Sequence, residues 1–157
     1  MIERLPVKVA FRRYTGPAGE PLGRFWRVTV APWLADHGLL DCPRYGVMLD
    51  DPGRTPPQDC RYDACVELPD GLTLPDAGET LIAGGRYAVT YFTGVAAEVG
   101  PAWASFARAA LADAAHRLDS NRQSVEHYPR GAFYDARTGV FACELCLPLT
   151  NQSWSDQ

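Results

Sequence analysis

The pattern of apolar and polar positions along this chain predicts short β-strands at residues 7–14, 45–50, 61–68, 86–93, 124–128 and 141–147. The alternation is clearest in the third of these, where Asp63, Cys65 and Glu67 interrupt a more apolar series. Because successive side chains of a strand point to opposite faces, these three residues share one face. The other face carries Tyr62, Ala64, Val66 and Leu68.

Two further segments repeat apolar residues at helical spacing. The first contains Leu22, Phe25, Trp26, Thr29, Trp33 and Leu34. It is expected to end at Gly38, a residue type favoured after a helix C-terminus, and to be kinked or interrupted at Pro32. The second is cleaner and has Pro101 in its expected first turn. Its stripe consists of Trp103, Phe106, Ala107, Ala110, Leu111, Ala114 and Leu118.

An internal repeat organises these elements. The segment "YTGPAGEPLGRFW" begins at residue 14 and is matched, 78 positions later, by "FTGVAAEVGPAWA". Further on, "DACVELP" at residues 63–69 is echoed by "CELCLP" at residues 143–148. Each half is therefore expected to supply a strand, a Gly-containing turn, a helix and two more strands.

This repeat predicts an α+β fold made of a duplicated β-α-β-β module, in a single domain over residues 1–157. Two such units side by side give a curved antiparallel sheet with two helices on one face and a ligand groove on the other. The repeats cover about residues 6–70 and 80–149. A linker rich in Gly, Pro and Asp joins them at residues 69–80, and residues 150–157 are expected to be a flexible tail.

One carboxylate, Glu144, stands in the middle of the apolar stretch "VFACELCLPL". Burying an unpaired charge is costly, so such a group is paired, protonated or available to a cationic ligand. Aligning Pro69 with Pro148 places Cys143, Leu145 and Leu147 on the helix-facing side of this strand. Glu144 and Cys146 are then expected on the opposite face, where Glu144 lines the groove.

The five cysteines are an odd number and do not indicate a secreted disulfide framework. The spacing Cys143-x-x-Cys146 is that of redox and zinc motifs, but on a strand these two positions point to opposite faces. No second Cys/His pair at metal-binding spacing follows. We expect reduced, packed thiols, with neither a metal nor a cofactor.

Charge and apolar-stretch length exclude two classes of binding partner, nucleic acids and membranes. The chain has 157 residues, a net charge of −4 and a single lysine, Lys8, so it lacks the basic surface that direct nucleic-acid binding requires. No apolar stretch is long enough to span a membrane, and the N-terminus has no apolar signal core. We expect a cytoplasmic protein that binds neither nucleic acid nor membrane.

Several motifs, in order, resemble the GyrI-like effector-binding domain, which occurs at the C-terminus of AraC- and MerR-type multidrug regulators and as a free-standing protein. They are the turn "DDP" at residues 50–52, "TP" at 55–56, the strand "YDAC" at 62–65 and "GGRYAV" at 84–89. The resemblance covers about residues 6–149 and implies a duplicated β-α-β-β fold. We expect a stand-alone form, because no helix-turn-helix precedes the first strand. The loop at residues 129–139 departs from the family pattern.

The resemblance also implies a ligand site. In the family's drug sensors a glutamate of the penultimate strand lies at the bottom of an aromatic-lined groove and contacts lipophilic cations. The matching residue is Glu126 in "SVEHY", with Tyr128 on the same strand face and His127 pointing away. Glu144, in the next strand, is its expected neighbour, and two close carboxylates would raise at least one pKa. Candidates for the aromatic lining are Tyr45, Tyr87, Trp26 and Trp103. The alternative is that Glu126 is exposed or paired with an arginine such as Arg130.

Two functions of different classes follow from this resemblance. The first is a non-catalytic binding module for amphipathic, cationic or planar aromatic small molecules. The alternative is a hydrolase of strained cyclopropane-type compounds, in which Glu126 or Glu144 acts with Tyr128 or Tyr87. A third branch of the family inhibits DNA gyrase through a protein surface. A protein partner such as a gyrase or a regulator, and a monomer or a dimer, all stay open.

Overall fold

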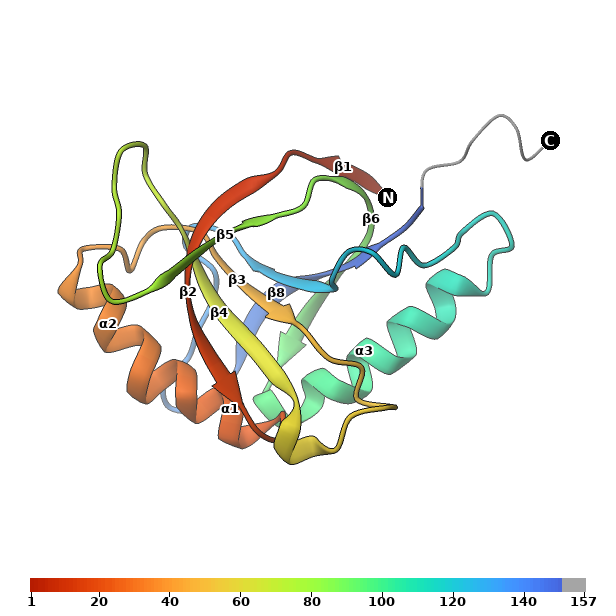
Figure 1. The fold of residues 1–157 in the computed structure, drawn as a ribbon. Helices are drawn as coiled ribbons and strands as arrows, with labels where there is room; N and C mark the ends of the chain where they lie inside the picture. Colours follow the sequence, from red (N-terminus) through yellow and green to blue (C-terminus); the bar gives the residue numbers. More distant parts are fainter. Residues whose placement is uncertain (151–157) are drawn as a thin grey trace.

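The computed structural model describes residues 1–150, which form a strongly curved, eight-stranded antiparallel sheet (Figure 1). Its strands are β1 (Ile2–Arg4), β2 (Val7–Thr15), β3 (Arg44–Met48), β4 (Arg61–Glu67), β5 (Gly78–Ile82), β6 (Gly85–Gly94), β7 (Val125–Tyr128) and β8 (Phe141–Pro148). Their order across the sheet is β1-β6-β8-β7-β3-β4-β2-β5. The six predicted strands are confirmed, and β1 and β5 are additional.

Two helical segments cover the same face of the sheet (Figure 1). The first is continuous and consists of α1 (Glu20–Phe25), a π-helical turn η1 (Trp26–Val30) and α2 (Ala31–Asp36). The second is α3 (Ala96–Leu111), and a short 3-10 turn, η2 (Pro57–Asp59), precedes β4. The predicted α+β class, with a curved antiparallel sheet and two helices on one face, is confirmed. Within residues 1–150 no helix is long and apolar enough to cross a lipid bilayer.

The first helical segment is interrupted and capped as its sequence predicts. Pro32 lies at the start of α2, directly after the π-helical turn, because proline has no N–H to continue the regular hydrogen-bond ladder. At the other end Gly38 adopts φ +68°, and the N–H of Leu39 bonds the Leu34 carbonyl at 2.8 Å. This left-handed glycine with its backward hydrogen bond is a Schellman C-cap.

The second helix differs from its prediction at both ends. It begins five residues before Pro101, which therefore lies inside the helix and not in its first turn. The start is fixed by Glu98, whose carboxylate accepts the N–H of Val95 at 2.9 Å. The helix ends at Leu111, so Ala114 and Leu118, which continue the apolar spacing, lie outside it. Leu118 instead forms an isolated antiparallel bridge to Leu149.

Each of the two additional strands pairs with a strand from the other half of the chain. β1 leads into β2 but pairs with β6, whereas β5 leads into β6 but pairs with β2. β5 occupies the end of the segment predicted to be a linker. The two crossing connections touch at Gly84, where an added Cβ would lie 2.7 Å from the Arg4 carbonyl oxygen and 2.8 Å from Pro6 Cδ. Each outer edge of the sheet is thus supplied by the opposite half of the chain.

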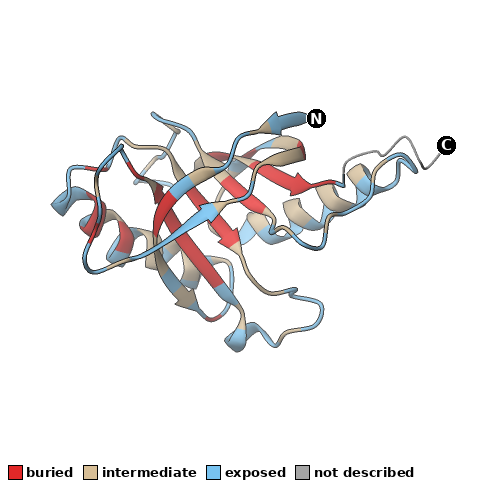
Figure 2. Ribbon diagram, turned by 45° about the horizontal axis from the view of Figure 1, so that its top comes forward, coloured by how far each residue is buried: buried red, intermediate tan, exposed pale blue. Residues whose placement is uncertain are grey.

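The sheet has two different faces. Toward the helices, which we call the helix face, lie Tyr62, Ala64 and Val66 from the first half and Cys143 and Leu145 from the second. The opposite face, which we call the far face, is packed around Val9, Tyr45, Val47, Cys65, Tyr87, Val125 and Cys146. Buried residues concentrate in the central strands, whereas the helices are mostly half-buried or exposed (Figure 2).

The C-terminal strand follows the predicted face assignment. Cys143 and Cys146 belong to hydrophobic clusters on opposite faces, so the Cys-x-x-Cys spacing does not bring the two sulfurs together. Thr150 donates its N–H to the Arg117 carbonyl at 2.9 Å. The rest of the predicted tail, residues 151–157, lies outside the described residues.

Candidate functional site

A buried carboxylate lies between the helices and the centre of the sheet. Glu126 projects from β7 on the helix face and is 5% exposed. One of its oxygens, Oε1, accepts hydrogen bonds from the hydroxyls of Tyr62 at 2.7 Å and Tyr128 at 3.2 Å. The other, Oε2, accepts the indole N–H of Trp103 at 3.1 Å. Its hydrogen-bond partners are therefore all aromatic side chains.

A second tryptophan extends this arrangement from the first helical segment. Trp26, the first residue of η1, donates its indole N–H to the Tyr62 hydroxyl at 3.1 Å. Its ring also lies 5.4 Å from that of Tyr128, centroid to centroid. We call the five residues Trp26, Tyr62, Trp103, Glu126 and Tyr128 the Glu126 cluster. Each helical segment thus supplies one tryptophan, so both halves of the chain meet at a single carboxylate.

Room for the cluster comes from a glycine on the neighbouring strand. Gly46 of β3 is directly opposite Glu126 of β7. A Cβ at this position would lie 1.7 Å from the Tyr62 hydroxyl oxygen and 2.7 Å from Glu126 Oε1. These separations are far below van der Waals contact, so the cluster requires a residue without a side chain at position 46.

Burial controls the protonation of the cluster. It raises the pKa of Glu126 above its ordinary value, while the hydrogen bonds from Tyr62, Trp103 and Tyr128 oppose that shift. The pKa values of Tyr62 and Tyr128 are raised well above the usual range, first by burial and then by the nearby Glu126 charge. Both hydroxyls therefore stay protonated at neutral pH and remain hydrogen-bond donors to the carboxylate.

The Glu126 carboxylate has no cationic partner among residues 1–150, since no Lys, Arg or His nitrogen lies within 4.0 Å of it. The contrast is Asp63, which is equally buried but is held by two hydrogen bonds from Arg13, at 2.8 and 3.1 Å. Pairing of Glu126 with Arg130 is accordingly not observed. Within the described residues, the donors that stabilise the Glu126 carboxylate are all neutral, so its negative charge has no compensating positive charge beside it.

The cover over Glu126 is thin. Neither α1 nor α3 contains a fully buried residue, and Trp26 and Trp103 are themselves only half-buried. The first helical segment is anchored further along by the buried residues Val30, Trp33 and Leu34, but overall the helices carry the less buried layer of the molecule in Figure 2.

Glu144 does not belong to this cluster. Across the β7–β8 pair, Glu126 is opposite Leu145 and Glu144 is opposite His127, so the two glutamates point to different faces. The expectation that they are neighbours is therefore wrong. Glu144 Oε1 lies 2.6 Å from His127 Nδ1, and the His127 ring stacks on Tyr45 with centroids 4.9 Å apart. Tyr45 and Glu144 form a separate far-face group.

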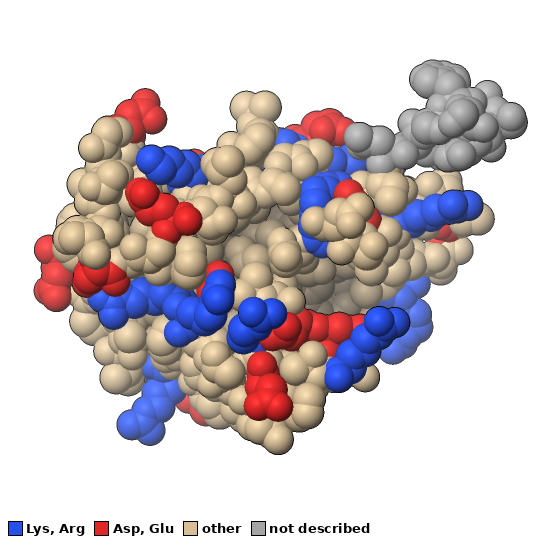
Figure 3. Space-filling view, viewed as in Figure 1, with Lys and Arg blue, Asp and Glu red and all other residues tan. Residues whose placement is uncertain are grey.

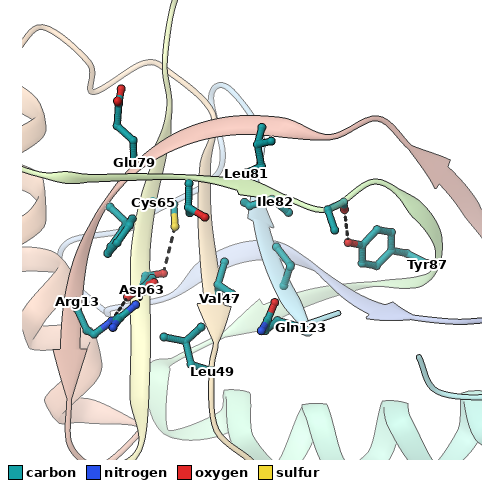
Figure 4. A pocket seen from close by; sticks show the side chains of 14 residues that line it. Arg13, Val47, Leu49, Asp63, Cys65, Glu79, Leu81, Ile82, Tyr87 and Gln123 are labelled. Atoms are coloured by element: carbon teal, nitrogen blue, oxygen red, sulfur yellow. Dashed lines mark hydrogen bonds and ion pairs between the residues drawn. The ribbon is translucent and has the colours of Figure 1, made fainter. Parts of the chain in front are cut away.

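Tyr87 also lies on the far face, where it lines the hollow predicted opposite the helices (Figure 4). This pocket has a volume of about 280 Å³ and lies between β5 and strands β3, β4 and β7. Neither Glu126 nor Glu144 lines it, and its buried carboxylate, Asp63, is neutralised by Arg13. Figure 3 shows a face hollowed near its centre, with uncharged side chains inside and charged ones around the rim.

Comparison with known proteins identifies the family. The sequence profile of the GyrI-like small molecule binding domain matches residues 2–150. The chain belongs to the GyrI-like family. A DNA gyrase inhibitor of Escherichia fergusonii is 27% identical over 121 residues, which are 74% of this chain and 76% of the relative. A putative transcriptional regulator of Bacillus subtilis, SPbeta prophage-derived YosT, is 32% identical over 91 residues, 56% of this chain and 61% of the relative.

Solved structures share the GyrI-like fold. SAV2435 bound to tetraphenylphosphonium superposes with a TM-score of 0.67 at 14% identity, covering 96% of this chain and 92% of that one. An integron cassette protein of Vibrio cholerae gives a TM-score of 0.56 at 16% identity, covering 95% and 94%. A putative transcription regulation protein of Staphylococcus aureus gives 0.63 at 13%, covering 96% of both.

Of the residues proposed from the sequence of this GyrI-like domain, Glu126, Tyr128, Trp26 and Trp103 come together, whereas Tyr45, Tyr87 and Glu144 lie on the far face. Tyr62, which makes the shortest hydrogen bond to Glu126, is not among the site residues predicted from the sequence. Its signal was the alternation of β4, which places Tyr62 on the face with Ala64 and Val66, toward the helices.

Proposed function

We propose that this chain binds lipophilic or planar aromatic cations at the Glu126 cluster and releases them unchanged. The observation that carries this proposal is a buried carboxylate whose described partners are all neutral and aromatic. The fold shared with SAV2435, whose structure contains tetraphenylphosphonium, gives supporting analogy for the ligand class.

Elementary energetics favour a large, weakly hydrated cation. A buried anion surrounded by low-dielectric material attracts positive charge strongly, but a small ion would lose too much hydration on entry. A delocalised organic cation loses less, and each aromatic face adds roughly 0.5–2 kcal/mol of cation–π attraction. The faces of Trp26, Trp103 and Tyr128 are the candidates for this contact.

Binding in this site requires the cover to move. Both Glu126 oxygens accept hydrogen bonds from the protein itself, and the side chain is 5% exposed. A cation that reaches the carboxylate therefore has to separate Trp26 or Trp103 from the sheet. Because both tryptophans are in the cluster, their fluorescence reports this displacement directly.

The test is a tryptophan-fluorescence titration with tetraphenylphosphonium. We expect saturable binding by the wild type and a loss of affinity of about tenfold or more for Glu126→Gln, which removes the charge but keeps the side-chain shape. Glu144→Gln is the matched control, since that carboxylate lies on the far face beside His127. Equal weakening by both substitutions, or no binding by the wild type, would contradict the proposal.

Hydrolysis of a strained electrophile is the second candidate for the same site. The supporting observation is the Tyr128–Glu126 pair, a hydroxyl and a carboxylate of raised pKa at 3.2 Å. Such a carboxylate can deprotonate water while a tyrosine hydroxyl polarises the electrophile. Consumption of a cyclopropane-containing substrate with turnover, lost in Glu126→Gln while binding persists, would favour this function over simple binding.

A further inference from the structure

An arginine without a hydrogen-bond or ion-pair partner among residues 1–150 lies next to the Glu126 cluster. Arg44 is the first residue of β3 and is directly opposite Tyr128 of β7. Because it is two positions from Gly46 along the strand, it shares the helix face with the cluster. Its guanidinium carbon lies 5.6 Å from the centroid of the Tyr128 ring, over the ring.

Arg44 is half-buried, yet its guanidinium makes no hydrogen bond or ion pair with any residue in 1–150. Two other half-buried arginines of this chain have carboxylate partners. Arg12 donates to Asp76 at 2.6 Å, and Arg122 donates to Asp119 at 2.8 Å and to main-chain carbonyls. A guanidinium has five N–H donors in a planar fork that matches a carboxylate, so Arg44 has capacity to bind an acceptor.

Burial lowers the pKa of the Arg44 guanidinium, and the nearby Tyr128 and Tyr62 oppose this shift. The group nevertheless stays charged at neutral pH. Without an anionic partner among residues 1–150, its N–H donors remain available, and an anionic ligand group at this position could pair with them.

Glu126 and Arg44 therefore place opposite charges on two sides of Tyr128. The Tyr128 hydroxyl donates to Glu126 at one end, and the face of its ring is next to Arg44. Trp26 and Phe141 flank the same ring, with centroids 5.4 and 6.1 Å away. An aromatic molecule lying along Tyr128 would meet the carboxylate with one end and the guanidinium with the other.

We infer that the preferred ligand of this site is zwitterionic: an aromatic cation that also carries a carboxylate, with the cation on Glu126 and the carboxylate on Arg44. This inference rests on the proposed function and narrows its ligand class. A site with a carboxylate and no arginine would instead bind a plain lipophilic cation of the same size more tightly than the zwitterion.

The experiment compares two dyes that share one ring system. Rhodamine B carries a free carboxylate and is zwitterionic at neutral pH, whereas rhodamine B ethyl ester is a plain cation. Binding of each dye, followed by its fluorescence anisotropy, is measured for the wild type and for Arg44→Met, Arg44→Lys and the control Arg54→Met. The Arg54 side chain is 88% exposed and lies outside the cluster.

We expect the wild type to bind rhodamine B more tightly than the ester, and Arg44→Met to weaken rhodamine B by about tenfold or more while leaving the ester unchanged or tighter. Arg44→Lys keeps the positive charge but lacks the planar guanidinium, so its affinity for rhodamine B should lie between those of the wild type and Arg44→Met. It also serves as the second variant if Arg44→Met fails to fold. Arg54→Met should match the wild type with both dyes.

The failures are distinguishable. If tetraphenylphosphonium does not bind, or binds independently of Glu126, the proposed function itself is wrong. If that cation binds through Glu126 but rhodamine B does not bind, or both dyes respond equally to Arg44→Met, only the zwitterion inference is overturned. Arg44 would then serve solely to pack against the Tyr128 ring.

Discussion

The proposed cation site would tie ligand affinity to pH, because a cation and a proton would compete for the Glu126 carboxylate. Burial raises the pKa of this group, so in the ligand-free protein it takes up its proton at a higher pH than an ordinary glutamate, whose pKa is about 4.3. We expect affinity for tetraphenylphosphonium to be constant above the raised pKa and to fall about tenfold per pH unit below it. Titrations over a pH series measure this.

The control for that pH series is Glu126→Gln, whose weaker binding should not vary with pH. Wild-type affinity that begins to fall only in the ordinary glutamate range would show that the pKa of Glu126 is not raised, and affinity that does not fall even below that range would show that its charge does not contribute to binding.

Gly46 is the second residue on which the cluster depends. Gly46→Ala places a methyl group 1.7 Å from the Tyr62 hydroxyl oxygen, so either Tyr62 moves away from Glu126 or the strands shift. We expect a loss of about 1–3 kcal/mol in unfolding free energy, as for other overpacked sites, together with weaker cation binding. Urea denaturation measures the first effect.

A matched control is Gly100→Ala, on α3, where an added Cβ meets nothing within 4 Å. Alanine is the better helix former, so this change should be neutral or stabilising by up to about 1 kcal/mol. If both substitutions had the same effect, close packing at position 46 would not be the reason for its glycine.

At this scale the sequence predicted part of the site. Glu126 and Tyr128 were accessible through the family motif, since they lie two positions apart on one strand. Glu144 lies on the face predicted for it, and the error was to place Glu126 on that same face. A shift of one residue moves a side chain to the other face, and nothing in the sequence fixed Glu126 opposite Leu145. Arg44 was missed because its significance lies in the partner it lacks, which only three-dimensional contacts reveal.

Among the elements, the helix before Gly38 ends through a conformation that side chains disfavour. Gly38 has φ +68° and no atom within 4 Å of an added Cβ, so substitution there tests backbone conformation alone. We expect Gly38→Ala to lower the unfolding free energy by about 1 kcal/mol. Gly38→Asn should lose less, because asparagine tolerates this region better. Equal stability of the alanine variant and the wild type, by thermal or urea unfolding, would show that the backbone conformation at position 38 does not require glycine.

Strands and helices were predicted best where the pattern is local. Pro32 and Gly38 act on their own segment, so the interruption and the C-cap of the first helix were both foreseeable. The start of α3 was misjudged because the Glu98 side chain caps Val95 upstream, whereas Pro101 looked like the stronger starting signal. β5 falls in the predicted linker because its exposed residues carry little apolar pattern.

For the whole molecule, the crossing at Gly84 joins the two halves. Gly84→Val would push a branched side chain against the Arg4 carbonyl and Pro6, and so separate the connections that carry β1 and β5. We expect a loss of about 1–3 kcal/mol in unfolding free energy, measured in urea. Ala83→Val, at the exposed neighbouring position, is the control and should change little. Similar losses for the two variants would show that the crossing is not tightly packed.

The internal repeat revealed the overall architecture but not this exchange. Self-similarity predicts that both halves form the same local elements, and it does so correctly for the paired modules around β3 and β7. It cannot say whether a lead-in strand joins its own module or the other one. That choice depends on the curvature of the complete sheet and on the contact at Gly84, neither of which has a signal in a single segment.

The exchange of β1 and β5 has a consequence for the history of this chain. A single module with its lead-in strand would leave its outer edge open and could complete it only with the same strand from a second copy. Two identical copies would then form a strand-swapped dimer. Fusion of two such genes, head to tail, would yield the topology seen here, with the Glu126 cluster at the former interface and freedom for the two halves to diverge around it.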